Sequence, residues 1–200
     1  MIIWDLCSGL GGWTHAFDKH VYRFDNSDLV QHVSGTFKED VRDWKQWILK
    51  YPKPDVIVAS PPCLEFSNAY NAPRPKAKRE GIAFNPDLSI LKACKEIIDF
   101  HNPRWWIIEN VAGASKDFSK QLGMPPRQII GPMFLWGYFP YLPISTASMG
   151  EARAGKTNDW NIGDPLRANK RAMIPLEVSQ ALYDVCYNQQ TLKEWGFELL

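Results

Sequence analysis

Three short segments of the sequence combine residue types that carry out chemistry in enzymes. They are a glycine-rich turn at residues 5–13, a Pro-Pro-Cys sequence at residues 61–63 and a Glu-Asn pair at residues 109–110. Each follows or ends a short apolar run of the kind that forms buried strands. A thiol, an acid and a turn with free amides are the parts of a nucleophilic site beside a ligand pocket.

The thiol of Cys63 follows two prolines at the end of the apolar run 56–59. The prolines hold the backbone extended and remove two amide donors, so Cys63 is presented from a stiff loop. A single cysteine is more often a small buried apolar group. The four cysteines are too far apart in sequence for a Cys-x-x-Cys pair, which argues against zinc and redox exchange. The position of Cys63 therefore favours a nucleophile.

Glu109 ends the apolar run 105–108, and Asn110 follows it. An acid at the end of a buried strand is partly desolvated, which suits it to donating a proton. Taken alone, Glu109 would more often cap a helix or pair with a base. Parallel strands joined by a crossover helix lie close together, however, so we expect Cys63 and Glu109 at one edge of a sheet.

The glycine-rich turn has neither the spacing of a Walker loop nor that of the dinucleotide fingerprint. Its glycines let the backbone approach a ligand, and a helix expected to begin at Trp13 offers amides to an anion. Asp25 and Asp40 follow later in the chain and are either ligand acceptors or ordinary turn acids. The turn alone is weak evidence for a particular cofactor.

Apolar runs and helical periodicity alternate along the chain, and this predicts the fold. The expected strands cover residues 2–6, 21–25, 55–60 and 104–109, with one or two more within 127–139. The expected helices begin at Trp13 and cover 41–50, 87–101 and 175–188. The pattern predicts an α/β protein with a doubly wound, mostly parallel Rossmann-like sheet, whose ligands gather at the carboxyl ends of the strands.

Composition limits the functions that remain. The chain has 200 residues, 45% of them hydrophobic, without an apolar run long enough for a membrane span or a signal sequence, so we expect one cytoplasmic domain. A formal charge of +1 excludes a protein that grips nucleic acid through overall charge. Two polar stretches are locally basic, at residues 71–82 and 151–171. This composition fits loops that face nucleic acid and also fits solvated loops.

The order of the three segments resembles the cytosine-5 DNA methyltransferase family. The sequences Asp5-Leu6-Cys7-Ser8-Gly9-Leu10-Gly11-Gly12, Pro61-Pro62-Cys63 with Phe66-Ser67, and Glu109-Asn110-Val111 look like its motifs I, IV and VI. The resemblance covers about residues 2–111. It implies one catalytic domain over 1–200 with a sheet of the S-adenosylmethionine-dependent methyltransferase type, which transfers a methyl group to carbon 5 of cytosine in DNA.

The resemblance also implies roles for individual residues. Cys63 would add to carbon 6 of cytosine, Glu109 would hold ring nitrogen 3 and the exocyclic amine, and Asn110 would support the loop. S-adenosylmethionine would lie over the glycine turn, with Asp25 on its ribose and Asp40 near its adenine. The implied cofactor-binding residues are Asp5, Cys7, Gly9, Gly11, Gly12, Trp13, Asp25, Asp40 and Pro61. The implied DNA contacts are Ser67, Arg74, Lys76, Lys78, Arg79 and Arg127, which would help a cytosine leave the duplex.

The sequence departs from the family pattern in four places. Cys7 stands where motif I usually has phenylalanine, so an aromatic contact would come from Trp13 or another tryptophan. Arg127 is the nearest candidate for motif VIII. Residues 170–175 replace the family's Gly-Asn-x-Val segment. Only residues 141–170 are available in place of a target-recognition domain, which predicts short or relaxed sequence specificity.

Other functions fit the same residues. An RNA cytosine methyltransferase would share these motifs. An enzyme acting on free cytosine nucleotides is favoured by the short insertion and disfavoured by the basic stretch. Transfer of a modified one-carbon group would use the same centre. A non-catalytic nucleic-acid-binding module is expected to have lost Cys63 or Glu109, and both are present.

Overall fold

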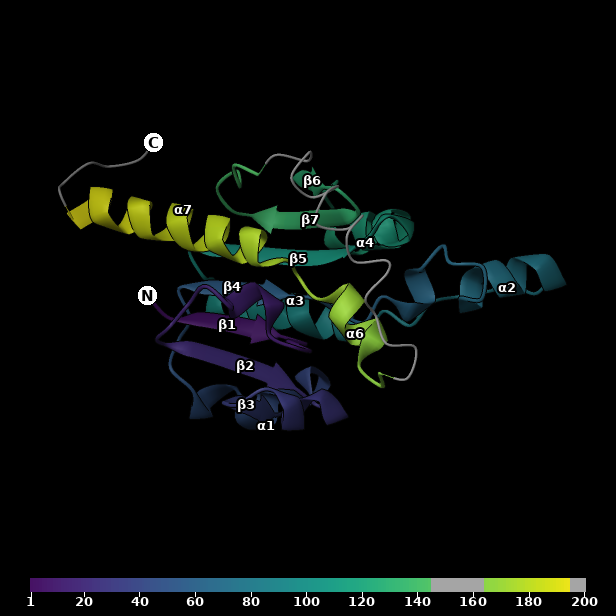
Figure 1. The fold of residues 1–200 in the computed structure, drawn as a ribbon, viewed down its shortest axis with the longest axis horizontal. Helices are drawn as coiled ribbons and strands as arrows, with labels where there is room; N and C mark the ends of the chain where they lie inside the picture. Colours follow the sequence, from purple (N-terminus) through teal and green to yellow (C-terminus); the bar gives the residue numbers. More distant parts are fainter. Residues whose placement is uncertain (145–163, 195–200) are drawn as a thin grey trace.

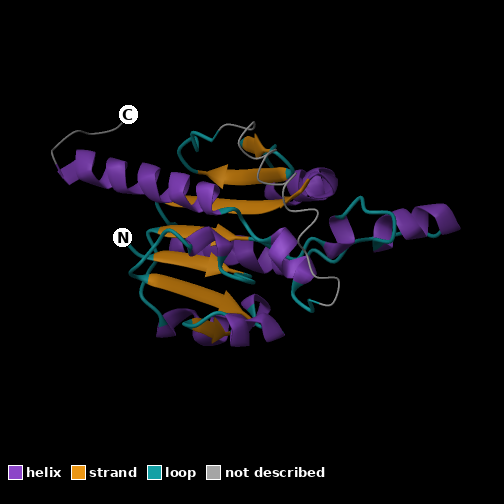
Figure 2. Ribbon diagram, in the orientation of Figure 1, coloured by secondary structure: helices purple, strands orange, loops and turns teal. Residues whose placement is uncertain are grey.

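The computed structural model describes residues 1–144 and 164–194, and its centre is one seven-stranded sheet (Figures 1 and 2). The strand order is β3-β2-β1-β4-β5-β7-β6. The strands are β1 (Ile3–Leu6), β2 (Val21–Asp25), β3 (Thr36–Lys38), β4 (Val56–Ala59), β5 (Trp105–Val111), β6 (Gln128–Ile130) and β7 (Met133–Tyr138). Strands β1 to β5 are parallel, and β7 runs antiparallel to β5 and β6. The predicted mostly parallel, Rossmann-like sheet is confirmed.

The central strands are apolar on both faces because helices cover both sides of the sheet. All four residues of β4 are buried, as are all four of β1. In the register of the sheet, Ala59 of β4 lies between Leu6 of β1 and Ile108 of β5. The chain segments that leave these three strands therefore start side by side at one edge, which we call the carboxyl edge.

One face of the sheet packs against α1 (Trp44–Trp47), α3 (Ser89–His101) and α4 (Ser115–Leu122). The predicted helix at 87–101 is confirmed as α3, and Asp87 accepts the Ser89 amide at 2.8 Å just before it begins. The predicted helix at 41–50 consists of α1 between two 3₁₀ turns, Val41–Asp43 and Ile48–Lys50.

The other face packs against α7 (Leu176–Glu194), which extends the helix predicted at 175–188 (Figure 1). The Ser179 hydroxyl of α7 donates to the Trp13 carbonyl at 2.7 Å and accepts the Ala16 amide at 3.0 Å. The glycine-rich turn near the start of the chain is therefore held by a helix near its end.

The helix predicted to begin at Trp13 is wrong. Only a 3₁₀ turn, Gly12–Thr14, forms there, because Trp13 and Thr14 are buried and bonded to other parts of the chain rather than to a following helical turn. Strand β3 and helices α2 (Pro73–Glu80), α4 and α6 (Arg167–Ala172) were not predicted from the sequence.

The basic stretch at 71–82, predicted as a loop, contains helix α2 (Pro73–Glu80). Proline occupies the first turn, where its missing amide costs nothing, and Gly81 ends the helix with a φ of 68°. Figure 1 shows that α2 projects beyond the carboxyl edge, away from the sheet.

Two further predictions concern the insertion at 141–170 and membrane-spanning segments. Residues 145–163 of the predicted insertion at 141–170 lie outside the described residues. Within the part of the chain that is described, no helix combines the length and apolar character needed to cross a membrane.

Candidate active site

Cys63 and Glu109 lie at the carboxyl edge, on the segment after β4 and near the end of β5. Both residues are half-buried. Burial raises the pKa of the Cys63 thiol, and the nearby negative charge of Glu109 raises that pKa further. The thiol and the carboxyl group are therefore close enough to interact electrostatically, as the order of the strands predicts.

Asn110 connects these two segments. It is fully buried, its Nδ2 donates to the Pro61 carbonyl at 2.8 Å, and its Oδ1 accepts the Val111 amide at 3.0 Å. The bond to Pro61 fixes the Pro-Pro-Cys segment relative to β5, two residues before Cys63. The position of Asn110 thus suits it to supporting the loop.

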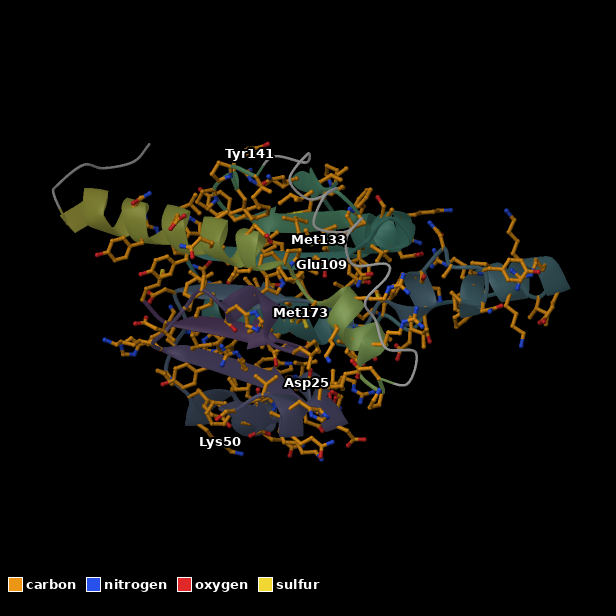
Figure 3. All side chains as sticks on the ribbon, viewed as in Figure 1. Asp25, Lys50, Glu109, Met133, Tyr141 and Met173 are labelled. Atoms are coloured by element: carbon orange, nitrogen blue, oxygen red, sulfur yellow. The ribbon has the colours of Figure 1, made fainter. Side chains whose placement is uncertain are left out.

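The glycine-rich turn lies beside the same segments. The Trp13 indole donates to the Ser60 hydroxyl at 2.9 Å, which connects the turn to the residues before Cys63. Trp13 is only 1% exposed and packs on the face of the sheet that α7 covers. In Figure 3, the labelled Glu109, Met173 and Asp25 lie along the carboxyl edge.

The glycines of the turn serve different purposes. Gly9 and Gly11 have φ values of +53° and +72°, a region that favours glycine. A Cβ on Gly12 would lie 2.7 Å from the Ile174 backbone, so Gly12 admits the segment after α6. Residues 170–175, which depart from the family pattern, therefore pack directly on the turn.

Asp25 supports the turn from the end of β2. Its two carboxylate oxygens accept the Gly9 and Ser27 amides, each at 2.7 Å. An ionised carboxylate has about four acceptor sites, so Asp25 retains capacity for further donors.

Beneath the turn, Asp5 is fully buried and its Oδ1 has no hydrogen-bond partner, while Oδ2 accepts the Thr14 hydroxyl at 3.3 Å. Burial raises the pKa of Asp5 to about 7 against the opposing charge of Arg23. The Ser8 hydroxyl is also buried without a partner. Buried polar atoms are normally paired, so these two atoms indicate a place where a polar ligand could complete the bonding.

Two predicted cofactor contacts are engaged elsewhere. Cys7 has a φ of 55°, and a hydrogen bond to Cys94 of α3 together with burial raises the pKa of its thiol. Cys7 thus faces the side of the sheet that α1, α3 and α4 cover. Both oxygens of Asp40 accept from the Arg42 side chain, which holds the pKa of that carboxyl below its ordinary value, and Asn26 donates to it as well.

Comparison with known proteins decides the family. A family model described as C-5 cytosine-specific DNA methylase matches residues 1–149, which include the glycine-rich turn, Cys63 and Glu109. The chain belongs to this family.

Other comparisons add less. The chain is 18% identical to a solved structure described as a DNA modification methyltransferase encoded within an E. coli prophage, with a TM-score of 0.41. The match covers 62% of this chain and 36% of that one, so the chain spans about a third of that protein's length. No curated protein matches the chain.

In this member of the DNA methylase family, the predicted DNA contacts fall into two groups. Lys76, Lys78 and Arg79 are exposed on α2, and Arg79 stacks on the exposed Tyr70 ring at 3.8 Å. Arg74 is directed inward, where it donates to the Gly113 carbonyl and pairs with Asp117. The structure therefore separates Arg74 from the three outward charges.

The last two predicted contacts differ in their distance from Cys63. Ser67 is half-buried at the end of the turn that begins at Cys63, and its hydroxyl accepts the Ala69 amide at 3.1 Å. Arg127 is exposed before β6, and its guanidinium lies 5.7 Å from the Phe139 ring, beyond the end of β7. Because β7 ends beside the start of β5, Arg127 is directed away from the carboxyl edge.

The residues that join the three segments of the site were not predicted from the sequence. Gly113, directly after β5, sits so close to the turn after Cys63 that a Cβ there would lie 2.0 Å from the Phe66 carbonyl oxygen. Asp117 and Ser179 also make contacts with residues far away in sequence. Gly113, four residues after Glu109, can be seen in the sequence, but its contact with Phe66 cannot be predicted from the sequence.

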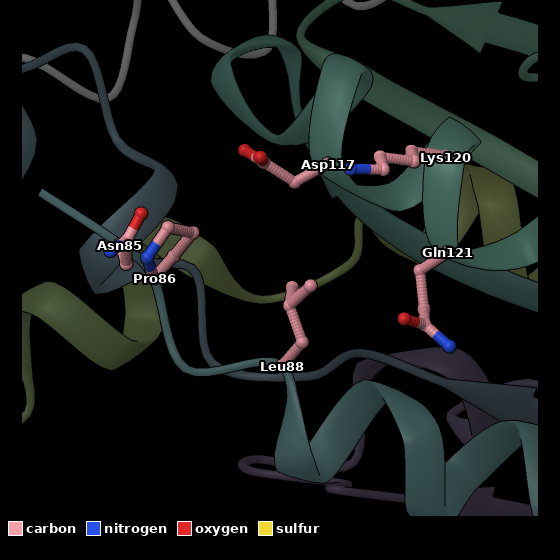
Figure 4. Close-up of a pocket in the computed structure, with 6 residues that line it drawn as sticks. All are labelled: Asn85, Pro86, Leu88, Asp117, Lys120 and Gln121. Atoms are coloured by element: carbon pink, nitrogen blue, oxygen red, sulfur yellow. The ribbon is translucent and has the colours of Figure 1, made fainter.

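A cavity of about 450 Å³ opens between residues 85–88 and α4 (Figure 4). It is lined by Asn85, Pro86, Leu88, Asp117, Lys120 and Gln121. Neither Cys63, Glu109 nor the glycine-rich turn lines it. We therefore place the candidate chemistry at the carboxyl edge and not in this cavity.

Proposed function

We propose that the chain transfers a methyl group from S-adenosylmethionine to carbon 5 of cytosine in DNA through a covalent adduct with Cys63. The observation that carries this proposal is the half-buried Cys63 thiol beside the Glu109 carboxyl group at the carboxyl edge, in a chain of the C-5 cytosine-specific DNA methylase family.

Carbon 5 of cytosine is a poor nucleophile, which is why a covalent step is needed. The Cys63 thiolate adds to carbon 6 and forms a carbon–sulfur bond, while Glu109 binds ring nitrogen 3 and the exocyclic amine. The addition breaks the π bond between carbons 5 and 6, and its electron pair makes carbon 5 nucleophilic. Carbon 5 takes the methyl group as the methyl–sulfur bond of the donor breaks. A base then removes the proton from carbon 5, the electron pair of that bond restores the double bond to carbon 6, and Cys63 leaves as the thiolate.

The electrostatic coupling of the two residues supports this order of events. A negative Glu109 raises the pKa of Cys63 and so disfavours the thiolate. When a proton taken up from solvent is shared between Glu109 and ring nitrogen 3, the negative charge of Glu109 is offset, and the pKa of Cys63 falls. The Cys63 thiolate is therefore favoured once a cytosine is bound with its ring nitrogen 3 against Glu109.

The residues around the glycine-rich turn fit the cofactor. Asp5 Oδ1 and the Ser8 hydroxyl are buried without partners, and Asp25 retains acceptor capacity that suits ribose hydroxyls. When bound, S-adenosylmethionine supplies a methyl group made electrophilic by a cationic sulfonium. A contact from Asp40 to the adenine would compete with Arg42, and an aromatic contact from Trp13 is limited by its burial.

The exposed charges of α2 support a nucleic-acid substrate. Lys76, Lys78 and Arg79 project with α2 beyond the edge that carries Cys63, where phosphates of a bound strand would pass (Figure 1). An enzyme acting on free nucleotides has no need of such an arm.

The test is covalent trapping. The protein is incubated with S-adenosylmethionine and an oligonucleotide containing 5-fluorocytosine, in which fluorine blocks the final elimination. We expect a denaturant-stable complex with wild type and with the control Cys186→Ala, and none with Cys63→Ser. A complex that persists with Cys63→Ser would contradict the mechanism. Trapping on transfer RNA or on a free nucleotide but not on DNA would contradict the substrate.

A further inference from the structure

Arg74 makes contacts that its neighbours on α2 do not share. Its Nη1 donates to the Gly113 carbonyl at 2.9 Å, and its Nη2 forms an ion pair with the Asp117 carboxylate. The two charged side chains are 28% and 25% exposed, so the pair is largely shielded from water. Gly113 lies in the turn after β5, and Asp117 lies in α4. Arg74 thus joins the base of α2 to the segment that follows Glu109.

The same guanidinium also contacts the segment that follows Cys63. It lies 5.7 Å from the Phe66 ring and 5.9 Å from the Phe84 ring. Phe66 is 3% exposed, and its amide donates to the Cys63 carbonyl at 3.0 Å, which closes the turn that begins at Cys63. The Phe66 ring meets the Phe118 ring of α4 edge-on at 5.0 Å. One side chain therefore contacts both segments that carry the candidate catalytic residues.

These two segments touch backbone to backbone at Gly113, where even a Cβ would collide with the Phe66 carbonyl. Phe66 lies three residues from Cys63, and Gly113 lies four residues from Glu109. A shift at this contact would change the distance between the thiol and the carboxyl group. Beside Asp117, a cavity lies between residues 85–88 and α4, so residues 85–88 do not fill the space next to the Arg74–Asp117 pair (Figure 4).

We infer that Arg74 is a positioning residue, whose bonds to Gly113 and Asp117 hold the turn of Cys63 in place against the segment that follows Glu109. The inference rests on the proposed function for its catalytic consequence. This role differs from the phosphate contact that the sequence predicts for Arg74, because the Asp117 carboxylate already neutralises the charge of Arg74.

The two roles predict different measurements. For Arg74→Gln and Asp117→Asn, we expect the rate of covalent trapping at saturating DNA to fall about tenfold to a hundredfold, since small displacements of reacting groups cost that much. The affinity for DNA and its dependence on salt should not change. For the exposed Lys78→Gln, we expect weaker binding of DNA and a salt slope smaller by about 0.9.

Further variants separate positioning from folding. The exposed neighbour Lys116→Gln is the matched control for Asp117→Asn and should leave both readouts unchanged. Arg74→Lys keeps the charge but not the forked geometry, so it should restore the trapping rate only in part. The double variant Arg74→Gln with Asp117→Asn should cost no more than either single change. Thermal unfolding identifies any variant that fails to fold, and Arg74→Lys and Asp117→Asn then carry the test.

Alkylation of Cys63 by iodoacetamide, without DNA or cofactor, tests the inference independently of methylation. We expect its rate to change in Arg74→Gln and Asp117→Asn but not in Lys78→Gln or Lys116→Gln. If wild type forms no trap while this pattern holds, the proposed function fails and the positioning role stands. Unchanged alkylation together with a reduced salt slope in Arg74→Gln would overturn the inference and make Arg74 a phosphate contact.

Discussion

Replacing Glu109 with glutamine should make the Cys63 thiol more reactive while abolishing methyl transfer. The negative charge of Glu109 raises the pKa of Cys63, so its removal lowers that pKa and increases the thiolate fraction at neutral pH. Burial still raises the pKa of Cys63 in the variant. Methyl transfer should nevertheless be lost, because glutamine cannot share a proton with ring nitrogen 3 in the same way.

The size of the effect follows from Coulomb's law. Two unit charges about 5 Å apart interact by about 1 kcal/mol in water and about 3 kcal/mol at an effective dielectric constant of 20. Cys63 and Glu109 are half-buried, so a value within that range applies. A difference of about 1.4 kcal/mol is tenfold in an equilibrium constant. A thiolate of lower pKa is also less nucleophilic, so we expect Cys63 in Glu109→Gln to be alkylated about threefold to tenfold faster near pH 7.

The assay follows iodoacetamide labelling of Cys63 by peptide mass spectrometry from pH 6 to 10. The exposed Glu80→Gln on α2 is the control and should label like wild type. The other thiols are a second control and should label slowly. Cys94 and Cys186 are buried, and the Cys7 thiol is hydrogen-bonded to Cys94. Labelling of Glu109→Gln that is no faster than wild type would refute the electrostatic coupling of the two residues.

Two further predictions concern stability. Asn110→Ala leaves the buried Pro61 carbonyl without its partner, so we expect a loss of about 1–3 kcal/mol in urea unfolding and slower trapping; an unchanged midpoint would contradict the role of this bond. For Asp5, the folded-state pKa of about 7 lies above the ordinary value of 3.8, so the folded state binds the proton more tightly and its stability falls as pH rises from about 4 to about 7. Asp5→Asn should remove up to about 4 kcal/mol of that fall. Equal slopes of unfolding free energy against pH in wild type and Asp5→Asn would show that Asp5 is not the cause.

Much of the sheet could be predicted because its central strands are continuous apolar runs. All of Val56–Ala59 is buried, as are Trp105, Ile107 and Ile108 of β5, and this leaves a clear signal in the sequence. The proximity of Cys63 and Glu109 follows from topology alone, because the two strands are parallel neighbours. Helix α3 was equally visible, since its apolar residues repeat at helical spacing.

The missed features depend on contacts between distant residues. Helix α2 buries only Ala77 and carries two prolines, so it has no amphipathic pattern to detect. In the sequence, Arg74 cannot be told apart from the other basic residues of its stretch. Its role becomes clear only from its hydrogen bond to Gly113, 39 residues away. The expected helix at Trp13 failed for the same reason, since its indole is bonded to Ser60, 47 residues along the chain.

The dependence of the glycine-rich turn on Ile174 and Ser179 has a consequence for biosynthesis. The residues that support the turn are translated more than 150 residues after the turn itself. A nascent chain ending at residue 149, the limit of the family match, would display the motif without the helix that braces it. Competence to hold a cofactor should therefore arise only after α7 has been translated.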